Sequence, residues 1–232
     1  MEQIARKYLE KDRLLHIAML ESLRLHEAEL LYAGEDGVLI RHISAGLYMF
    51  SAASENSAAK MAGLIRDPAV ILLHQSCLKD EIMSRFSLKG TMPCHQAAWL
   101  KDEPVPAAPS IADLKPLTEA DLPIVLHHYH SVDGPEYVKE RLKAGMLGAY
   151  VNGELAGFIG THPEGSIGLL EVLPAFRRRG LAMVLESAMM QRQQSLGRVP
   201  YAHIKLNNEA SVALHKKLGM EVTDEASLCW LY

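Results

Sequence analysis

The sequence predicts an α+β fold, and three features of its second half indicate it. Short apolar runs typical of strands alternate there with amphipathic runs of helical length. Asn152-Gly153 separates two strand-like runs, and this dipeptide suits a two-residue hairpin turn because both residues tolerate positive φ. The run 167–173 is apolar almost throughout and ends at Pro174, which cannot donate to a sheet ladder. We therefore expect a central strand there, buried on both faces.

The first half predicts less regular elements. Apolar residues recur at helical spacing over 14–25, and Ser54 precedes an alanine-rich helix that runs to Ile65. This half has no glycine-rich phosphate loop, and its scattered histidines are expected to be packed or surface side chains. The predicted strands cover 38–40, 47–50, 69–74 and 97–100.

The second half predicts the element order ααβββαβαβ. Gly197 is expected to end the helix that follows Gly180, and Asn208 is expected to cap the last helix. The predicted helices cover 120–129, 136–143, 181–196 and 209–218. The predicted strands cover 147–151, 155–161, 167–173 and 201–206, with closing strands at Val222 and 227–232.

A proline-rich stretch separates the two halves. Lys101–Ser110 has the sequence KDEPVPAAPS, and its three prolines remove backbone donors and fix φ. We therefore expect a linker or surface crossing over 102–110, between an N-terminal domain, 1–101, and a C-terminal domain, 111–232.

Composition and charge narrow the function classes. The chain has 232 residues, of which 49% are hydrophobic and 22% charged, values typical of a folded protein. Its net charge is −4, whereas a general nucleic-acid binder needs an excess of Lys and Arg. Acids and bases are mixed from the first residues and no apolar stretch approaches a bilayer span, so we expect no membrane contact and a cytoplasmic location. Cys77, Cys94 and Cys229 are widely spaced and are expected to be reduced thiols.

The residues most suggestive of chemistry lie at one strand-to-helix junction, Arg177-Arg178-Arg179-Gly180-Leu181-Ala182. A helix N-terminus exposes unpaired N–H groups and partial positive charge, which suit a phosphate. Gly180 lets a ligand approach the backbone because it has no Cβ, and the arginines add fixed positive charge. These features suit a pyrophosphate; from the spacing alone, a solvated basic turn before a surface helix is an equal alternative.

In this arrangement the residues resemble the GNAT superfamily of acyl-CoA-dependent N-acetyltransferases. Residues 177–182 match its core motif of Arg or Gln, two residues, Gly, one residue, then Gly or Ala. Glu171-Val172-Leu173-Pro174 resembles the end of the family's fourth strand, and 208–220 resembles its N-x-x-S-x-x-L-Y-x-x-x-G-F helix. The blocks come in the family's order, and the resemblance covers roughly 115–232. It is closest to the glycine-N-acyltransferase-like branch, whose members often carry an incomplete second copy of the fold at the N-terminus.

The resemblance implies the GNAT fold, a mixed, mostly antiparallel central sheet with splayed strands, flanked by helices. It implies a related but partial α/β architecture for the N-terminal half, which lacks the arginine-rich loop and is expected not to bind CoA. The pantetheine arm of acetyl-CoA would lie between the strand ending at Leu173 and the strand 201–206, and the N–H groups from Arg178 to Ala182 would hold the pyrophosphate. Asn208 is both a helix cap and a cofactor contact in this interpretation. The implied acetyl-CoA-binding residues are Val172, Leu173, Arg177, Arg178, Arg179, Gly180, Leu181, Ala182, Asn208 and Ser211.

The implied reaction is direct attack of an amine on the thioester, which requires a base or a water chain to take a proton. Glu171 is the first candidate for the catalytic base, because it is the only acid on an apolar strand and burial would raise its pKa. The alternative is that Glu171 points to a neighbouring basic group and does no chemistry. His203, on the adjacent strand, and His162, at a strand end, are weaker candidates.

His215 departs from the family pattern, which commonly has Tyr at this position to protonate the leaving thiolate. Either His215 is the catalytic acid in its place, or the thiolate leaves unaided because thiols ionise near pH 8.5. The cluster His127-His128-Tyr129-His130 contains candidate metal ligands, but adjacent helical residues point in different directions, so no metal is expected. In GNAT-like folds this region borders the acceptor pocket.

Three functions remain open on the sequence. The first is an N-acetyltransferase that moves an acetyl group from acetyl-CoA to a primary amine of a small molecule or amino acid. The second, which the missing Tyr supports, is a non-catalytic acyl-CoA-binding regulatory protein. The third is a peptide or protein N-acetyltransferase. The expected partner is a small-molecule amine, with no nucleic acid and no membrane; a homodimer is left open.

Overall fold

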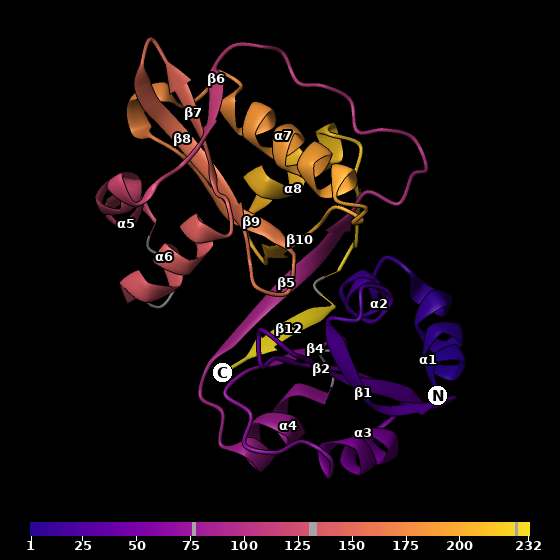
Figure 1. Ribbon diagram of the computed structural model, residues 1–232. Helices are drawn as coiled ribbons and strands as arrows, with labels where there is room; N and C mark the ends of the chain where they lie inside the picture. Colours follow the sequence, from indigo (N-terminus) through magenta and orange to yellow (C-terminus); the bar gives the residue numbers. More distant parts are fainter. Residues whose placement is uncertain (76–77, 130–133, 226) are drawn as a thin grey trace. The chain divides into compact units, whose positions relative to one another are not determined.

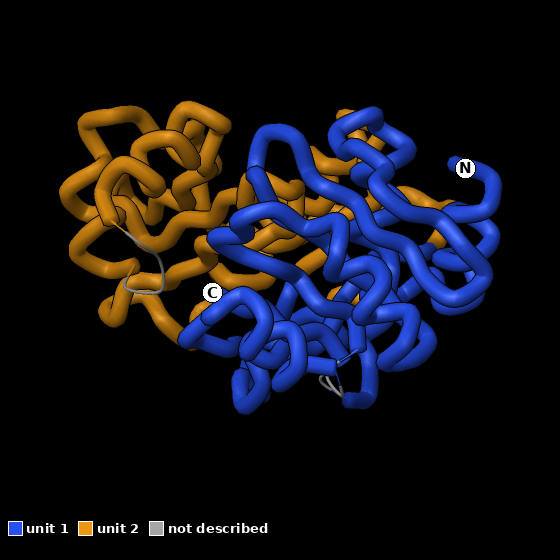
Figure 2. The backbone as a smooth tube through the Cα atoms, turned by 90° about the horizontal axis from the view of Figure 1, so that it is seen from below, with its two compact units in different colours: residues 1–100, 203–216, 220–232 blue, residues 101–202, 217–219 orange. Residues whose placement is uncertain are grey.

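The computed structural model describes residues 1–75, 78–129, 134–225 and 227–232 (Figure 1). The chain divides into two compact units (Figure 2). Unit 1 comprises residues 1–100, 203–216 and 220–232, and unit 2 comprises 101–202 and 217–219.

Unit 1 is built on a sheet with the strand order β1-β2-β3-β4-β12-β5, and β11 also pairs with β5. All of these strand pairs are antiparallel except β3 with β4, which are parallel and joined by helix α3. The elements are α1 (Glu2–Leu9), η1 (Glu10–Asp12), α2 (Ile17–Arg24), β1 (Ala28–Gly34), β2 (Gly37–His42), β3 (Tyr48–Ala52), α3 (Glu55–Ala62), β4 (Ile71–Leu73), α4 (Lys79–Phe86), β5 (Thr91–Ala98), α8 (Glu209–Lys217), β11 (Glu221–Val222) and β12 (Leu228–Leu231).

Unit 2 has the strand order β6-β7-β8-β9-β10, in which only β9 and β10 are parallel. Helix α7 joins these two strands, as α3 joins β3 and β4 in unit 1. Strand β10 begins in unit 2 and ends in unit 1, and α8 ends at Lys217 in unit 2. The elements are β6 (Asp113–Pro116), η3 (Glu119–Asp121), α5 (Leu122–His128), α6 (Gly134–Lys143), β7 (Leu147–Val151), β8 (Glu154–Thr161), β9 (Ile167–Val172), η4 (Pro174–Phe176), α7 (Leu181–Ser195) and β10 (Tyr201–Lys205).

The helices of unit 2 cover both faces of its sheet (Figure 1). Phe158 of β8 is fully buried with Val125 of α5 and Val138 of α6. A Cβ on the preceding Gly157 would lie 3.1 Å from Leu185 of α7, on the opposite face. Alternation along β8 therefore places α5 and α6 on one face and α7 on the other.

The predicted α+β fold is confirmed, with a mixed, mostly antiparallel sheet flanked by helices. From α5 to α8 the predicted order of helices and strands is also confirmed, and Asn208 caps α8 by accepting a hydrogen bond from the Ser211 N–H at 3.2 Å. The sequence analysis missed α1, β1, α4 and β6, and it began β5 too late. The expectation that 167–173 is buried on both faces is wrong in part, because Leu170, Glu171 and Val172 are half-buried.

The predicted linker lies along α7 and is hydrogen-bonded to it; we call residues 102–110 the strap. The Val105 N–H donates to Gln194 Oε1 at 2.8 Å, and the Val105 carbonyl accepts from Gln191 Nε2 at 3.2 Å. Ser187 Oγ donates to the Pro106 carbonyl at 2.7 Å, and Gln194 Nε2 donates to the Glu103 carbonyl at 3.2 Å. These bonds hold the strap along the length of the helix. The division into domains at residues 102–110 stays a prediction.

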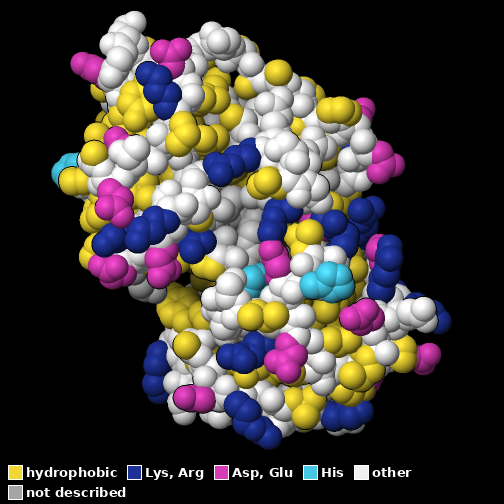
Figure 3. Space-filling view, in the orientation of Figure 1, with side chains coloured by type: hydrophobic (Ala, Val, Ile, Leu, Met, Phe, Trp, Pro, Cys, Tyr) yellow, Lys and Arg dark blue, Asp and Glu magenta, His cyan; other side chains and the backbone are white. Residues whose placement is uncertain are grey.

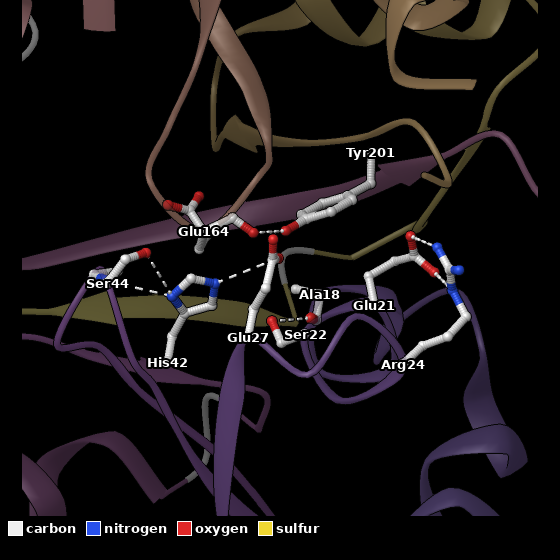
Figure 4. A network of polar contacts seen from close by, with 10 residues as sticks. Ala18, Glu21, Ser22, Arg24, Glu27, His42, Ser44, Glu164 and Tyr201 are labelled. Carbon is white, nitrogen blue, oxygen red and sulfur yellow. Dashed lines mark hydrogen bonds and ion pairs between the residues drawn. The ribbon is translucent and has the colours of Figure 1, made fainter. Parts of the chain in front are cut away.

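The histidines of unit 1 that the structure buries are packed side chains, as expected. His16 is bonded to the Leu9 carbonyl at 3.0 Å and to Ser51 Oγ at 2.9 Å. His42 lies between Ser44 and Glu27, with 3.9 Å from its Nε2 to the Glu27 carboxylate (Figure 4). Burial holds the pKa of His74 well below its ordinary value, so this ring stays neutral. Among the described residues, no helix is both long and apolar enough to cross a membrane.

Two of the three cysteines are buried on neighbouring strands of unit 1. Cys94 is 0% exposed and Cys229 is 1% exposed. Burial raises the pKa of the Cys94 thiol to about 12, and burial also raises the pKa of Cys229. Cys77 lies outside the described residues.

We expect Cys94 to resist iodoacetamide at pH 8 in the folded protein. The thiolate is the reacting form, and with a pKa of about 12 only about one Cys94 in ten thousand is ionised at that pH. Peptide mapping by mass spectrometry should show alkylation at Cys94 only after unfolding in urea. Complete alkylation of Cys94 in the folded protein within minutes would contradict its burial.

Candidate functional site

The junction between β9 and α7 forms a backbone turn with two residues in the left-handed region. After η4, Arg177 is extended, Arg178 has φ +63° and Gly180 has φ +85° at the N-cap of α7. A Cβ on Gly180 would meet only Ile111 Cδ1, at 3.4 Å. The glycine is required by its backbone conformation, and it also leaves the space above the helix end open.

The N–H groups of Arg178, Arg179, Gly180, Leu181 and Ala182 have no acceptor within the described part of the chain; we call residues 178–182 the N–H row. The next N–H group, that of Met183, donates to the Gly180 carbonyl at 3.1 Å. Successive N–H groups in a turn with left-handed residues form a concave nest for anions, here at the positive end of a 15-residue helix. The N–H row is therefore suited to a phosphate group.

The three arginines at the junction are exposed, and one of them pairs with a described carboxylate. Arg177 pairs with Glu171, and Arg179 donates to the Ala175 carbonyl at 3.0 Å and lies over the Phe176 ring at 5.4 Å. Arg178 and Arg179 form no ion pair with a described carboxylate. The predicted local cluster of positive charge is thus present beside the N–H row.

Strand β9 contains a bulge that the sequence analysis missed. Phe158 lies opposite Glu171 and Gly160 lies opposite Gly168, so β9 uses one more residue than β8 between these two pairs. Leu169, within this interval, has φ +51° although it is a buried leucine. A bulge bends its strand and disrupts the ladder locally. No sequence signal marks it, because a leucine rarely takes this conformation.

The far end of β9 has backbone groups that face away from β8. The Leu173 N–H donates to the Ala156 carbonyl of β8 at 2.9 Å, so the backbone groups of Val172 point to the other side. On that side, the only register pair with β10 among the described residues is Ala202 opposite Ile167, at the start of β9. Arg177 Nε donates to the Val172 carbonyl at 2.9 Å.

Glu171 is half-buried and forms an ion pair, which corrects the expectation of a buried carboxylate. Its side chain is 25% exposed, and its Oε1 lies 2.9 Å from Arg177 Nη2. This is the neighbouring basic group that the alternative interpretation proposed. The arginine is itself 57% exposed, so the pair lies at the surface of unit 2.

Two tyrosines, one directly after α5 and one in α6, pack against the apolar cluster that contains Leu169 of β9. Burial raises the pKa of Tyr129 to about 12, with a smaller contribution from the Glu171 charge. Tyr137 is bonded to His162 Nδ1 at 2.5 Å, and burial raises the pKa of this phenol also. Both hydroxyls therefore stay protonated near neutral pH. His130 lies outside the described residues.

The ring of His162 packs against Gly168 of β9. A Cβ on Gly168 would lie 2.3 Å from His162 Nε2, so the ring packs where any other residue would carry a side chain. The turn that follows is held by Tyr201 of β10, whose hydroxyl donates to the Glu164 carbonyl (Figure 4). With Tyr137 bonded to its Nδ1, His162 has a packing role in unit 2.

The remaining predicted site residues lie in unit 1, around α8. Asn208 Oδ1 caps the helix by accepting the Ser211 N–H. His215 is only 3% exposed, and its Nδ1 lies 2.7 Å from the Ser211 carbonyl, one turn back. His203 of β10 packs edge-on against Trp230, with 5.5 Å between the ring centroids. The roles assigned to these residues stay predictions.

The charged surface agrees with the composition. On the face shown in Figure 3, acidic and basic side chains are interspersed with apolar ones. In the described ranges, no three His, Cys, Asp or Glu side chains are grouped so that they could hold a metal ion.

Replacing Glu171 by Gln should change the free energy of unfolding by less than about 1 kcal/mol, because exposed ion pairs contribute about 0–1 kcal/mol. Urea unfolding measures this, with Glu10→Gln as a control that removes another exposed pair, Arg6 with Glu10 at 3.7 Å. A loss of about 3 kcal/mol or more, as expected for a buried pair, would contradict the exposed position of this ion pair.

Residues 145–231 match the family model described as FR47-like protein. No curated protein gives a significant match. A Drosophila protein of known crystal structure is similar, with a TM-score of 0.64 and 18% identity over 99% of this chain and 94% of that one. So are a putative GNAT-family acetyltransferase from Novosphingobium aromaticivorans (TM-score 0.55, 20% identity, 93% and 94% covered) and a GCN5-related N-acetyltransferase from Kribbella flavida (0.53, 15%, 94% and 93%). The chain has the fold of the GNAT acetyltransferases.

Proposed function

We propose that this protein is an N-acetyltransferase that transfers the acetyl group of acetyl-CoA to a primary amine of a small molecule or amino acid by direct attack. The N–H row at the start of α7 is the observation that carries the proposal. It offers five donors that have no acceptor in the described ranges, beside two arginines that no described carboxylate pairs with. The oxygens of a diphosphate can accept hydrogen bonds from such donors, because the N-terminus of a helix binds anions.

The backbone of unit 2 is suited to the rest of the cofactor. The N–H row lies just beyond the end of β9, so a chain attached to the diphosphate can run back along this strand. Val172 presents its backbone groups on the side away from β8, where they can pair with the amides of a pantetheine arm. Arg177 has to release the Val172 carbonyl for that pairing, and its exposure makes this movement inexpensive.

Glu171 is the base in this proposal. The amine has to lose a proton to attack the thioester carbonyl carbon, and the Glu171 carboxylate can accept it, directly or through water. The movement of Arg177 away from Val172 would also free this carboxylate, because one guanidinium holds both groups. Cofactor entry and activation of the base are thereby linked through a single side chain.

The negative charge that develops on the thioester oxygen needs a donor, and a backbone N–H on the open side of β9 is suited to it. When the carbon–sulfur bond breaks, the thiolate has to take a proton. His215 is buried with its Nδ1 bonded to its own helix, so unaided departure, with protonation by solvent, is the simpler course.

A second candidate function is acyl-CoA binding without catalysis. The ion pair between Glu171 and Arg177 favours it, since a carboxylate oxygen bonded to a guanidinium is not available to accept a proton from an amine. The two functions share the N–H row and differ only in turnover. The glycine-N-acyltransferase-like branch, the small-molecule acceptor, the cytoplasmic location and a homodimer remain proposals.

Gly180→Trp should weaken the binding of acetyl-CoA at least a hundredfold, because an indole would cover the N–H row. Gly197→Trp is the matched control, since Gly197 is also left-handed, at φ +70°, has nothing within 4 Å of an added Cβ, and lies at the other end of α7. Both variants bear the same kind of backbone strain, about 1–2 kcal/mol. Isothermal calorimetry with acetyl-CoA measures the difference.

Equal affinities of the two variants would refute the placement of the site. If wild-type protein binds acetyl-CoA, a thiol-release assay over a panel of primary amines decides between the two functions. Turnover that falls at least a hundredfold in Glu171→Gln, with binding of acetyl-CoA retained, supports the enzyme. Binding without thiol release on any amine supports the non-catalytic protein.

A further inference from the structure

A serine, a histidine and a glutamate come together in unit 1 at the hairpin of β2 and β3 (Figure 4). Ser44 lies in the loop 43–47 that joins the two strands, His42 is the last residue of β2, and Glu27 directly precedes β1. The Ile43 N–H donates to the Glu27 carbonyl at 2.8 Å, which holds the loop beside this glutamate. The three side chains therefore come from backbone that is fixed on both sides.

The hydrogen bonds of the loop define which ring nitrogen of His42 carries the proton. The Ala45 N–H donates to Nδ1 at 3.3 Å, so this nitrogen has a lone pair and no proton. The Ser44 hydroxyl lies 3.4 Å from the same nitrogen and is therefore a donor to it. In the neutral ring the proton is on Nε2, which lies 3.9 Å from the Glu27 carboxylate. Hydroxyl, imidazole and carboxylate thus follow one another in the order that activates a nucleophile, with the loose distances of a site without substrate.

Burial differs among the three residues in a way that suits these roles. Ser44 is exposed, so a substrate can reach its hydroxyl. The His42 side chain is only 1% exposed, and that of Glu27 is 30% exposed. Unit 1 has a second contact of this kind, between His16 and Ser51, but Ser51 is 0% exposed and no substrate can reach it. Of these two contacts, only that of Ser44 with His42 is open to a substrate.

We propose that Ser44, His42 and Glu27 form a second active site, which hydrolyses carboxylic esters of small molecules. The proposal is independent of the acetyltransferase function and shares no residue with the N–H row. Ser44 is the nucleophile, His42 is the general base and acid, and Glu27 is a positioning residue that holds the ring and stabilises the imidazolium through Nε2–H.

The reaction has two steps, and His42 Nδ1 moves one proton in each. Ser44 Oγ attacks the ester carbonyl carbon while Nδ1 takes the hydroxyl proton; the bond from carbon to the alcohol oxygen then breaks, and the alcohol leaves with that proton. Water attacks the resulting acyl-serine while Nδ1 takes a proton from the water. The bond to Ser44 Oγ breaks, the proton returns to the serine, and the carboxylic acid leaves.

The Ala45 N–H is suited to the negative charge that develops on the carbonyl oxygen. When Nδ1 takes the Ser44 proton, it can no longer accept a hydrogen bond from Ala45, so this N–H is released. Because the Ser44 hydroxyl and the Ala45 N–H both lie next to one ring nitrogen, the released donor is close to the carbon that Ser44 attacks. The N–H of the residue after the nucleophile has the same use in α/β-hydrolases.

The surroundings of Ser44 favour a small ester with an apolar group. Ile43, the preceding residue, is 64% exposed and can contact the acyl or alkyl chain. A Cβ on Gly46, in the same loop, would have nothing within 4 Å, so the loop is open on that side. An open site contributes little binding energy. Short-chain esters of phenols, whose phenolate leaves readily, are therefore expected to react fastest.

Diisopropyl fluorophosphate tests the nucleophile, because an activated serine hydroxyl displaces its fluoride and retains the phosphoryl group. Peptide mapping by mass spectrometry should place the adduct at Ser44, and Ser44→Ala should abolish it. Ser84→Ala is the matched control, since it removes another exposed serine of unit 1, on α4, and should label at a rate within twofold of wild type.

Hydrolysis of 4-nitrophenyl acetate tests the other two residues. Ser44→Ala and His42→Gln should lower kcat at least tenfold. Glu27→Gln should lower kcat about tenfold and leave KM within twofold of wild type, because Glu27 acts on the imidazole and does not touch the ester. Thermal unfolding checks that each variant folds. Ser44 is exposed and Glu27 is half-buried, so their variants keep the test decisive if His42→Gln does not fold.

Absence of an adduct at Ser44 in the folded wild-type protein would overturn the assignment of the nucleophile. Ester hydrolysis that is unchanged in Ser44→Ala would overturn the second activity. An unchanged kcat in folded Glu27→Gln would remove Glu27 from the site. These results leave the proposed acetyltransferase function intact, because the binding of acetyl-CoA is measured separately.

Discussion

The site depends on backbone groups that the fold leaves unpaired. Two left-handed residues, Arg178 and Gly180, turn the chain between β9 and α7 so that five consecutive N–H groups have no acceptor among the described residues. Unpaired backbone donors are costly where water cannot reach them and useful where a ligand can. The turn is exposed, so water can accept hydrogen bonds from these donors until an anion displaces the water. The helix dipole and the nearby arginines then favour the anion.

Unit 1 shows what the same connection looks like without such a site. It also has two parallel strands joined by a helix, but α3 begins at a capping box in which Ser54 and Ser57 each accept the other's N–H. The Gln75 side chain accepts the Ala52 N–H at 2.8 Å and donates to Ser51 Oγ at 2.8 Å, so the groups at the end of β3 are used internally. Because these donors already have partners within unit 1, the start of α3 does not offer an anion the row of N–H groups that the start of α7 offers.

Local chemistry was predictable from the sequence, and tertiary contacts were not. Asn208 caps α8 as expected, because the cap is a local hydrogen bond between its side chain and the Ser211 N–H. The bulge at Leu169 has no local signal, since the surrounding packing imposes a conformation that leucine disfavours. The strap was expected to be a linker because its prolines prevent regular pairing; its attachment to α7 depends on glutamines some 90 positions later in the chain. Pairing of Glu171 with Arg177 was one of two alternatives, which only coordinates could separate.

The position of β12 has a consequence for the order of folding. This strand, Leu228–Leu231, is inserted between β4 and β5, with Cys229 opposite Leu73 on one side and Pro93 on the other. The sheet of unit 1 thus cannot close until residues near 230 have left the ribosome, although most of the unit is synthesised first. Before that, β4 and β5 have exposed edges that can pair with other chains. Pairing between strands far apart in the sequence slows folding. During synthesis, unit 1 therefore remains incomplete, whereas unit 2 can fold earlier because it is contiguous except for three residues.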